Sequence, residues 1–588
     1  MKLFLLIISF ALCVSEVYAK TYNIPDVQFP TIQSAINDAN HNDVIIVSPG
    51  RYKENIDFLG KAIMLRSVEP NDANIVEITI IDGNEPNDPN FGSTVTFRNG
   101  EDVNSVLSGF TITGGTGSWL VIAWEYHEPY WNRCGGGVVC YNMSSPTINK
   151  NIIRDNIAGE GGGVYIYGDP VNINNPSNPP VHIEPVIRNN RFISNRAVQD
   201  HNYLPPDTEY AFEEHGDGGA IVCFQGVDAI VTGNIIEENH ADYYGGGMHF
   251  RQWSHGEISN NQILGNDSAL GGGIHITYFS SPLINNNLVK SNTSGGFGGG
   301  GVYIYFYSNP IVIENVITQN ESTNGAGMGI YWSSQPTIRN NLIVKNINGS
   351  GILNKSNSPL LIINNTIADN SADIWGGGIE LYEGTCPIIE NNIIVSNGDG
   401  YGVYGYSGAS AVIRYNDVWG NLSGGYNMEI GVQCGINGNI SADPCFIDDA
   451  NDDYHLRSNG WRWDAMRDRW DWDDVTSRCI DAGNPGYVLG DELDFVPEDP
   501  NGQYAENLRI NMGFYGGTEE ASLPPYKWSL VGDINNDGAV NMADVDFFHQ
   551  SWLDTGSNTP TDFNRNHTVN FIDFAILAAD WLNQTAWR

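Results

Sequence analysis

Two segments near the C-terminus carry the oxygen-bearing side chains that a calcium ion requires. GDINNDGAVNMADVDFFHQSWL is followed 29 residues later (533 to 562) by TDFNRNHTVNFIDFAILAADWL. Each places Asp or Asn at loop positions 1, 3, 5, 9 and 12, and calcium takes six to eight oxygens from such compact loops. The two sets are Asp533, Asn535, Asp537, Asn541 and Asp544, and Asp562, Asn564, Asn566, Asn570 and Asp573. We predict two calcium ions, one in each loop.

The two loops differ at their sharp turn. Gly538 supplies that turn in the first loop, whereas His567 stands there in the second. Asn566 also replaces the acid that the first loop has at position 5. Because glycine adopts tight turns most easily and calcium prefers charged ligands, we expect the second site to bind calcium more weakly.

Each calcium loop runs into one amphipathic helix that ends in Trp-Leu. A duplicated loop–helix unit closing on Asp resembles the dockerin type I domain, over about residues 529–584. The resemblance implies a small, all-α domain that folds on calcium and attaches its protein to a cohesin-bearing scaffold. By the same analogy, the side chains facing a cohesin include Met542, Ala543, Phe571 and Ile572.

The rest of the chain is dominated by an internal repeat. Glycine-rich triplets recur from residue 135 to residue 402, mostly 24 to 28 residues apart. Two series of asparagines follow them, always five residues apart. The first is Asn151, Asn190, Asn234, Asn261, Asn287, Asn315, Asn341, Asn365, Asn392 and Asn416, and the second is Asn156, Asn195, Asn239, Asn266, Asn292, Asn320, Asn346, Asn370, Asn397 and Asn421. Alternating apolar residues between these landmarks predict short strands, so each repeat is one coil of a solenoid with asparagines stacked along it.

This pattern resembles the right-handed parallel β-helix, the pectin-lyase-like superfamily, over roughly residues 22–440. The fold expected is all-β, with about ten to twelve coils and a small helical calcium-binding domain after it. The segment FPTIQSAINDANHNDVIIVSPGRYKENI strengthens the resemblance. Ile32, Ala35, Ile36 and Ala39 give one apolar helix face, which is expected to plug the open end of the core.

The strand after each glycine triplet presents two rows of side chains outward. Inward positions such as Ile274 and Ile276 are apolar throughout. Most of one outward row is aromatic, and aromatic rings stack on the C–H faces of sugars. The candidates for substrate binding are Tyr141, Tyr167, Phe224, Tyr305, Tyr331, Tyr382 and Tyr406. The competing interpretation is a tyrosine ladder that stacks on itself and stiffens the strand face.

Two insertions enter the same strand face and place a candidate pocket near the first five repeats. Residues 117–133 are rich in aromatic side chains and residues 196–217 are acidic, so we expect both to rise beside the face as walls. The candidate catalytic residues are His249, Arg251, His275, Asp242, His215 and Asp217, with Glu213, Glu214 and His240 nearby. A carboxylate pair suits glycoside hydrolysis, and a basic residue beside carboxylates suits β-elimination on an acidic sugar. Ordinary solvated loop charges are the alternative, and the motif sets of polygalacturonases and pectate lyases are absent.

The composition and the N-terminal sequence limit the binding partners and the cellular compartment that we expect for this protein. The formal charge is −41 and the pI about 4.3, so the surface repels phosphates and we expect no nucleic-acid partner. Residues 1–19 read as a secretory signal peptide, and no later segment is apolar enough to span a membrane. Removing Cys13 with the signal leaves seven cysteines, of which Cys134, Cys434, Cys445 and Cys479 could form bridges in pairings that stay open.

The expected organisation is therefore a signal peptide (1–19), an N-terminal cap with the first coils (20–75), the β-helix (76–440), a capping segment with linker (441–525) and the dockerin (526–588). Trp461, Trp463, Trp470 and Trp472 are expected to cover the far end of the core. We predict a secreted, carbohydrate-active protein that binds or degrades extracellular polysaccharide as a lyase, hydrolase or epimerase. The alternative is a non-catalytic adhesion protein, and the sequence leaves open whether the chain is an enzyme.

Overall fold

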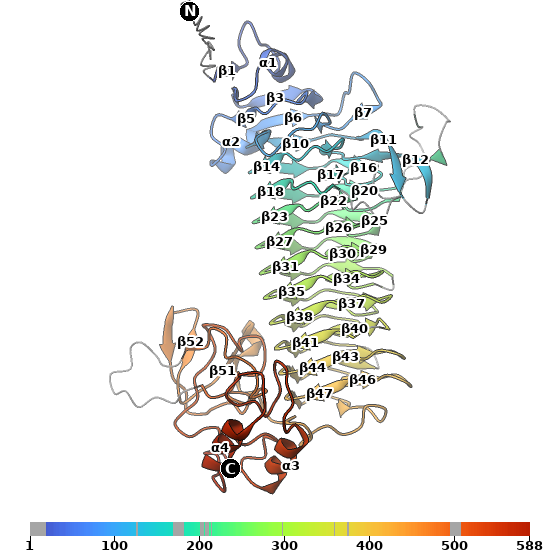
Figure 1. Cartoon of the computed structure of the whole chain (residues 1–588). Coiled ribbons are helices and arrows are strands. Elements are labelled where there is room, and N and C mark those ends of the chain that lie inside the picture. The colour runs from blue at the N-terminus through green and yellow to red at the C-terminus, as the bar shows by residue number, and fades with distance from the viewer. Residues whose placement is uncertain are drawn as a thin grey trace, which may run out of the picture.

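The fold is described from a computed structural model in which parallel strands stack into a long solenoid (Figure 1). The residues described are 19–124, 127–168, 181–199, 205, 211–212, 215–296, 298–357, 359–372, 375–493 and 507–588. The predicted signal peptide lies outside them, apart from its last residue. Within this part of the chain, no helix is both long and apolar enough to cross a membrane.

Three long parallel sheets form the sides of the solenoid. The first sheet contains β1 (Thr21–Ile24), β2 (Val44–Val47), β5 (Met64–Ser67), β9 (Val106–Ser108), β14 (Thr147–Asn149), β18 (Val186–Arg188), β23 (Ile230–Thr232), β27 (Glu257–Ser259), β31 (Leu283–Asn285), β35 (Ile311–Ile313), β38 (Thr337–Arg339), β41 (Leu361–Ile363), β44 (Ile388–Glu390) and β47 (Val412–Arg414). The second contains β3 (Gly50–Lys53), β6 (Thr79–Asp82), β10 (Thr111–Thr113), β15 (Ile152–Arg154), β19 (Arg191–Ile193), β24 (Ile235–Glu237), β28 (Gln262–Leu264), β32 (Leu288–Lys290), β36 (Val316–Thr318), β39 (Leu342–Val344), β42 (Thr366–Ala368), β45 (Ile393–Val395) and β48 (Asp417–Trp419).

The third sheet carries the outward rows singled out in the sequence. It contains β4 (Ile56–Asp57), β8 (Val95–Phe97), β13 (Val138–Cys140), β17 (Val164–Tyr167), β22 (Ile221–Phe224), β26 (Met248–Arg251), β30 (Ile274–Thr277), β34 (Val302–Ile304), β37 (Met328–Tyr331), β40 (Ile352–Lys355), β43 (Gly376–Leu381), β46 (Tyr401–Gly405) and β49 (Gly424–Tyr426). With 14 strands in the first sheet, the solenoid has more coils than the ten to twelve expected. The first coils lack the glycine and asparagine landmarks, so counting landmarks missed them.

Shorter elements complete the fold. A small sheet beside the third one contains β16 (Ile157–Ala158), β20 (Arg196–Ala197), β25 (His240–Tyr244), β29 (Asp267–Leu270) and β33 (Thr293–Ser294). A second small sheet contains β7 (Phe91–Gly92), β11 (Gly117–Trp124), β12 (His127–Cys134) and β21 (Ala211–Phe212). The remaining elements are α1 (Ile32–Asp38), α2 (Ala73–Ile78), β50 (Phe446–Asp448), η1 (Asp449–Asn451), β51 (Asp453–Leu456), β52 (Arg462–Asp464), β53 (Arg469–Asp471), α3 (Met542–Gln550) and α4 (Phe571–Ala579).

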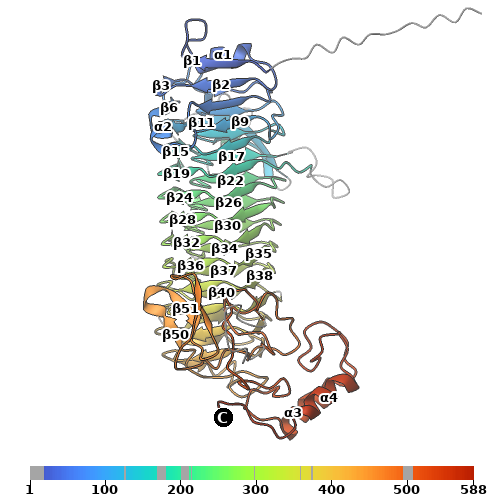
Figure 2. The same cartoon turned by 90° about the vertical axis from the view of Figure 1, so that its left-hand side faces the viewer.

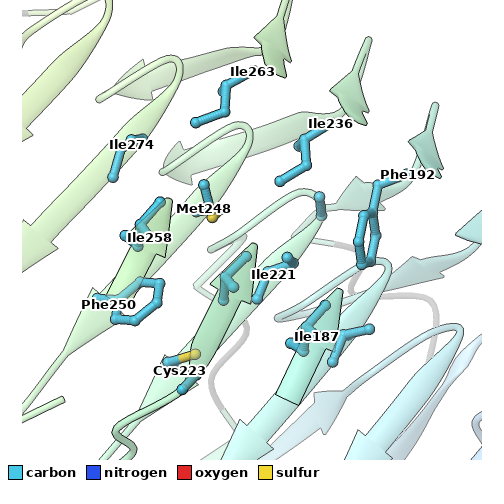
Figure 3. Packing of buried hydrophobic residues seen from close by; sticks show 14 of the residues in the cluster. Ile187, Phe192, Ile221, Cys223, Ile236, Met248, Phe250, Ile258, Ile263 and Ile274 are labelled. Carbon is cyan, nitrogen blue, oxygen red and sulfur yellow. The ribbon is translucent and has the colours of Figure 1, made fainter. Parts of the chain in front are cut away.

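The core is a continuous apolar column inside the coils (Figure 3). Inward residues such as Met248, Ile263 and Ile274 are fully buried, which confirms the register predicted from the alternating pattern. The predicted plug is confirmed as well. The apolar face of α1, including Ile32 and Ile36, joins the same cluster and closes the N-terminal end.

The two asparagine series form continuous ladders, as predicted. In each coil the Asn Oδ1 accepts both the backbone N–H and the side-chain Nδ2 of the Asn before it, at 2.8–3.3 Å. Nδ2 also donates to a carbonyl of the preceding coil, as from Asn292 to Ile263 (2.9 Å). The first ladder continues one step beyond the sequence-based series, to Asn439. The ladders therefore satisfy the buried polar groups at two corners of each coil from Asn151 onward.

The C-terminal segment packs against the side of the last coils (Figures 1 and 2). Asn340 Nδ2 donates to the carbonyls of Phe514 (2.8 Å) and Gly516 (2.7 Å), and the Gly513 amide donates to Asn391 (2.8 Å). Residues of β39 and β45 share an apolar cluster with this segment and with the helical domain. The cap, the last coils and α3 and α4 are thus joined into one packed unit.

The predicted role of the tryptophans is wrong. Tyr426 and Ile430 pack against the end of the core, whereas none of the four tryptophans belongs to the core cluster of the described residues. Trp463 and Trp470 instead contact each other across β52 and β53, with ring centroids 5.7 Å apart. No disulfide links the cysteines in the described part of the chain, and Cys434, Cys445 and Cys479 carry thiols.

Candidate functional site

Strand register brings the candidate catalytic residues together on the outer face of the third sheet. Across β22, β26 and β30, Val222 pairs with His249 and His249 with His275. Two residues further along, Phe224 pairs with Arg251 and Arg251 with Thr277. Because successive strand residues alternate between the core and the outer face, these side chains all point away from the apolar column.

The hairpin formed by β11 and β12 covers part of this face. Leu120, Ile122 and Tyr130 of the hairpin form a buried apolar cluster with Tyr165 and Phe224 of the sheet. The insertion at 117–133 therefore lies over the strands and does not form the wall beside them that the sequence predicts. Its apolar alternation, with Leu120 and Ile122 on one side of the strand, gives it a face that must be buried.

Arg251 lies at the centre of a buried group of charges. Its Nη1 donates to Asp217 Oδ2 at 2.8 Å, and its Nη2 donates to both carboxylate oxygens of Glu160 at 3.0 Å. Its guanidinium carbon also lies 3.9 Å from the centre of the Phe224 ring. His215 Nδ1 lies 3.4 Å from Glu160 Oε1, and its side chain, 29% exposed, is the solvent-facing member of the group. Both carboxylates are fully buried.

Sequence reasoning missed Glu160. Glu160 and Asp217 occupy the same place in successive coils, immediately before a glycine turn, and they pair through isolated parallel bridges. Those bridges run on from Cys134 to Tyr244. Comparing the residue that precedes each glycine triplet would have put Glu160 beside Asp217.

Burial dominates the electrostatics of this group. It raises the pKa of Asp217 to about 7, against the Arg251 guanidinium, which lowers the pKa, and with the Glu160 carboxylate, which raises it further. Burial alone would lower the pKa of Arg251, but Glu160, Tyr130 and Asp217 hold it well above its ordinary value. Burial lowers the pKa of His249 well below its usual range and that of His275 to about 3. Both imidazoles are therefore neutral at physiological pH.

The two buried histidines stack on each other. Their ring centroids are 4.6 Å apart with an interplanar angle of 8°. Tyr244 and Tyr303 contact the His275 ring at 4.9 and 5.0 Å. None of the four ring nitrogens makes a hydrogen bond within the described residues. His249 Nδ1 comes closest to a charged group, 3.6 Å from Asp217 Oδ2.

Asp242 contacts His240 and is separate from the Arg251 group. His240 Nε2 is 3.0 Å from Asp242 Oδ1, and His240 Nδ1 is 2.6 Å from Asp267 Oδ2. The other Asp242 oxygen accepts the Gln199 amide at 2.8 Å. These groups lie at the partly exposed edge formed by β25 and β29. Glu213 and Glu214 lie outside the described residues.

The aromatic row divides into buried and accessible members. Tyr167, Phe224 and Tyr331 are buried by neighbouring side chains, so their rings serve packing and offer no free face to a sugar. The partly exposed members are Tyr141, Tyr305, Tyr382 and Tyr406. Tyr331 contacts Tyr303 of the other outward row edge to face at 5.1 Å, so its ring packs against the sheet face.

An accessible aromatic ledge lies on the last coils of the third sheet. It consists of Trp375, Tyr382, Tyr404 and Tyr406, with ring centroids 4.2 to 5.8 Å apart. Trp375 is 47% exposed. Glu380 lies among these rings, and burial raises its pKa against Tyr406 and Lys355, which lower it.

Lys355 completes the ledge and lies 3.9 Å from the centre of the Tyr382 ring. Glu380 and Lys355 stand in the outward rows of the sequence repeat and could have been found there. Trp375 precedes a glycine turn, outside either row.

Both predicted calcium loops fold into matching cradles. Asp533 accepts the amides of Asp537 (3.1 Å) and Gly538 (2.9 Å), and Asp562 accepts those of Asn566 (3.1 Å) and His567 (2.7 Å). The four end acids, Asp533, Asp544, Asp562 and Asp573, are buried. Buried carboxylates gathered with amide oxygens in a short loop fit calcium chemistry, so the residues present suit the ion.

The last acid of each loop has two roles. Asp544 Oδ2 accepts the Asn541 amide at 2.9 Å, and Asp573 Oδ2 accepts the Asn570 amide at 2.9 Å, each closing a capping box at the start of α3 or α4. The helices therefore begin where the loops end. His567 adopts a φ of 68° at the place where Gly538 has 88°.

Comparison with known families assigns both parts of the chain. Residues 207–343 and 296–441 match the model of a right handed beta helix region, and residues 531–582 match that of a dockerin type I domain. The chain is a right-handed parallel β-helix protein with a C-terminal type I dockerin. Type I dockerins bind calcium, which agrees with the two cradles of this one.

The chain was also compared with solved structures and with curated proteins. The solved structure titled "The complex structure of XylC with xylose" aligns with 72% of this chain and 87% of its own, at a TM-score of 0.30 and 12% identity. No curated protein matches the sequence.

Proposed function

We propose that this β-helix protein is exported, binds extracellular polysaccharide along the outer face of its third sheet, and is held on a cohesin-bearing scaffold by its dockerin with two calcium ions. The observation that supports the binding role is the aromatic ledge of Trp375, Tyr382, Tyr404 and Tyr406. The N-terminal sequence, read as a secretory signal, supports export.

The chemistry of the ledge suits a sugar chain. Partly exposed rings offer flat apolar surfaces to sugar C–H groups, while Lys355 supplies a hydrogen-bond donor beside them. The protein carries a formal charge of −41, which opposes the approach of a polyanion. We therefore expect a neutral glycan to bind better than a uronate polymer.

Degradation of the glycan is the second candidate. It is favoured by His215, which lies partly exposed above two buried carboxylates, one with a pKa of about 7. An acid of that pKa can donate or accept a proton near neutral pH. Against it, Glu160 and Asp217 are both sealed from solvent, which leaves binding as the better supported role.

A panel of insoluble and soluble polysaccharides tests both roles on the full-length protein with calcium. Affinity electrophoresis measures binding, while reducing ends and ultraviolet absorbance measure hydrolysis and elimination. Trp375→Ala and Tyr382→Ala should weaken binding at least several-fold. Trp472→Ala is the matched control, because this tryptophan is 61% exposed in the C-terminal cap, outside the third sheet.

The outcomes separate the candidates. Binding that survives both ledge substitutions would refute the ledge as the glycan site. Product from any glycan would establish degradation, and His215→Ala should then reduce its rate. An unchanged rate in that variant would exclude the Arg251 group from catalysis.

The dockerin is tested separately. Addition of calcium should increase the helical circular dichroism signal, and a chelator should reverse the increase. A recombinant type I cohesin should retain the protein only with calcium, and Phe571→Asp should weaken that retention because Phe571 is 76% exposed. A titration without spectral change would refute the calcium sites.

A further inference from the structure

The Arg251 group contains buried polar atoms that the protein itself leaves without partners. Asp217 Oδ1 accepts no hydrogen bond from the described residues. The two ring nitrogens of His249 neither donate nor accept one there. Both residues are fully or almost fully buried. A buried carboxylate oxygen and a buried imidazole without partners are each unfavourable, so their joint occurrence calls for a ligand.

Three side chains in this group converge on a common point. One ligand atom each from Glu160, His215 and Asp217 lie within 4.8 Å of one another. Two of the three are fully buried, and His215 gives access from solvent. Ligands about 2.1 Å from a shared tetrahedral ion lie roughly 3.4 Å apart, so the required closure is on the order of 1 Å.

The charges of the group favour a cation. Glu160 and Asp217 share the single guanidinium of Arg251, which leaves one carboxylate charge without an arginine partner. The same hydrogen bonds fix the orientation of both carboxylates, as groups behind metal ligands commonly do. Asp217 Oδ1 stays available, because Arg251 uses only Oδ2.

We propose that Glu160, His215 and Asp217 bind a divalent first-row transition metal ion. His249 lies beside this cluster, with its Nδ1 3.6 Å from Asp217 Oδ2, but it is not one of the three converging side chains. Imidazole nitrogen together with carboxylate oxygen suits zinc, iron, cobalt or nickel, whereas calcium and magnesium prefer oxygen alone. The ion would differ in kind from the calcium of the dockerin, and its binding does not depend on a glycan.

The test uses the full-length protein with its dockerin saturated by calcium. Zinc is added, free metal is removed by gel filtration, and bound zinc is measured by elemental analysis. Competition with a chromophoric chelator gives its affinity, and cobalt provides a visible absorption spectrum that reports the ligand field. The wild-type protein should bind about one zinc ion per chain at this site in excess calcium.

Three variants locate the ion. Asp217→Asn and His215→Ala should each weaken zinc binding by about 10-fold or more and change the cobalt spectrum. His240→Ala is the matched control, because His240 also lies between two carboxylates, Asp242 and Asp267, but outside the proposed site. It should leave the binding at this site unchanged.

Near-ultraviolet circular dichroism and metal-free melting report folding. If Asp217→Asn fails to fold, His215→Ala decides, because His215 is partly exposed. The proposal is overturned if the wild-type protein binds no zinc, if both site variants bind it as tightly as wild type, or if only His240→Ala loses it. If the wild-type protein binds no zinc, a proton on Asp217 would neutralise the second buried carboxylate beside Arg251 instead.

Discussion

Single asparagines determine how one coil is joined to the next. Asn292 accepts the amide and side-chain N–H groups of Asn266 and donates to Asn320 and to the Ile263 carbonyl. Every one of these atoms is buried, so no water can replace a lost partner. The ladder therefore demands an amide, which both donates and accepts, and neither Asp nor Leu meets that requirement.

Asn292→Ala should lower the free energy of unfolding by about 2–4 kcal/mol, because it leaves donors of Asn266 and the Ile263 carbonyl without partners. Urea unfolding followed by tryptophan fluorescence measures the change. Asn104→Ala is the control, since Asn104 is exposed and bonds only to the nearby Asp102. Equal effects of the two substitutions would contradict the importance assigned to the ladder.

The second calcium loop carries a strained residue. His567 has a left-handed φ of 68°, a conformation that costs an ordinary L-residue about 1–2 kcal/mol relative to glycine. His567→Gly should strengthen calcium binding at this loop by about 1 kcal/mol. His567→Ala removes the imidazole but keeps Cβ, and should give no such gain. Isothermal titration with calcium separates these outcomes.

At the scale of elements, the hairpin of β11 and β12 decides which part of the outer face is accessible. Its inner residues seal the aromatic side chains of β17 and β22, while the face over the last coils of the third sheet stays open at the ledge. The hairpin also covers the Arg251 group, with Tyr130 stacked on His215 at 5.2 Å. One insertion thus separates a buried polar group from an exposed aromatic surface on the same sheet.

Ile122→Ala should lower the free energy of opening the hairpin by about 2–4 kcal/mol, because Ile122 is fully buried between the hairpin and the sheet. Hydrogen exchange in β17 and β22 should become faster. Val121→Ala, one residue away and facing partly outward, is the matched control and should have little effect. Unchanged exchange in the Ile122 variant would mean that the hairpin does not hold the face closed.

The repeat could be predicted from sequence because its information is local and recurs in most of the coils. The alternation at Ile274 and Ile276 gives the register, and the asparagine spacing gives the ladders. The hairpin could not be predicted, since the repeat says nothing about the direction in which an insertion folds. Glu160 was missed because its partners Arg251 and Asp217 lie in other coils, and the tryptophans were misplaced because the capping segment has no repeat to fix its position.

At the scale of the whole molecule, buried polar groups hold the β-helix, the cap and the dockerin together. The Cys479 thiol of the cap donates to Asp417 Oδ2 of β48 at 3.2 Å, and the Ala442 amide donates to Asp417 Oδ1 at 3.0 Å. Arg509 Nη1 of the cap donates to the Asp533 carbonyl in the first calcium loop at 2.8 Å. The three parts therefore share one seam of buried polar contacts.

This seam should weaken as the pH rises. Burial raises the pKa of Asp417 to about 7 from an ordinary value of 3.8, so the folded state binds this proton more tightly than the unfolded state does. Stability contributed by the protonated group is complete below about pH 4 and is lost as the pH rises to about 7. Asp417→Asn should raise stability on the order of 2 kcal/mol at pH 8 and little at pH 4, as measured by thermal melting with calcium. A pH-independent effect would contradict the shift.

The closed ends of the solenoid prevent copies of the molecule from stacking end to end. The strands of each coil pair with those of the next, and the asparagine ladders do the same from Asn151 onward, so an open end would offer unpaired hydrogen-bonding groups to a second copy. Repetition of that step would be polymerisation into a fibre. The α1 helix at one end, and Tyr426 with Ile430 at the other, terminate the pattern. The least repetitive parts of the chain thus set its length and keep a self-templating architecture from growing.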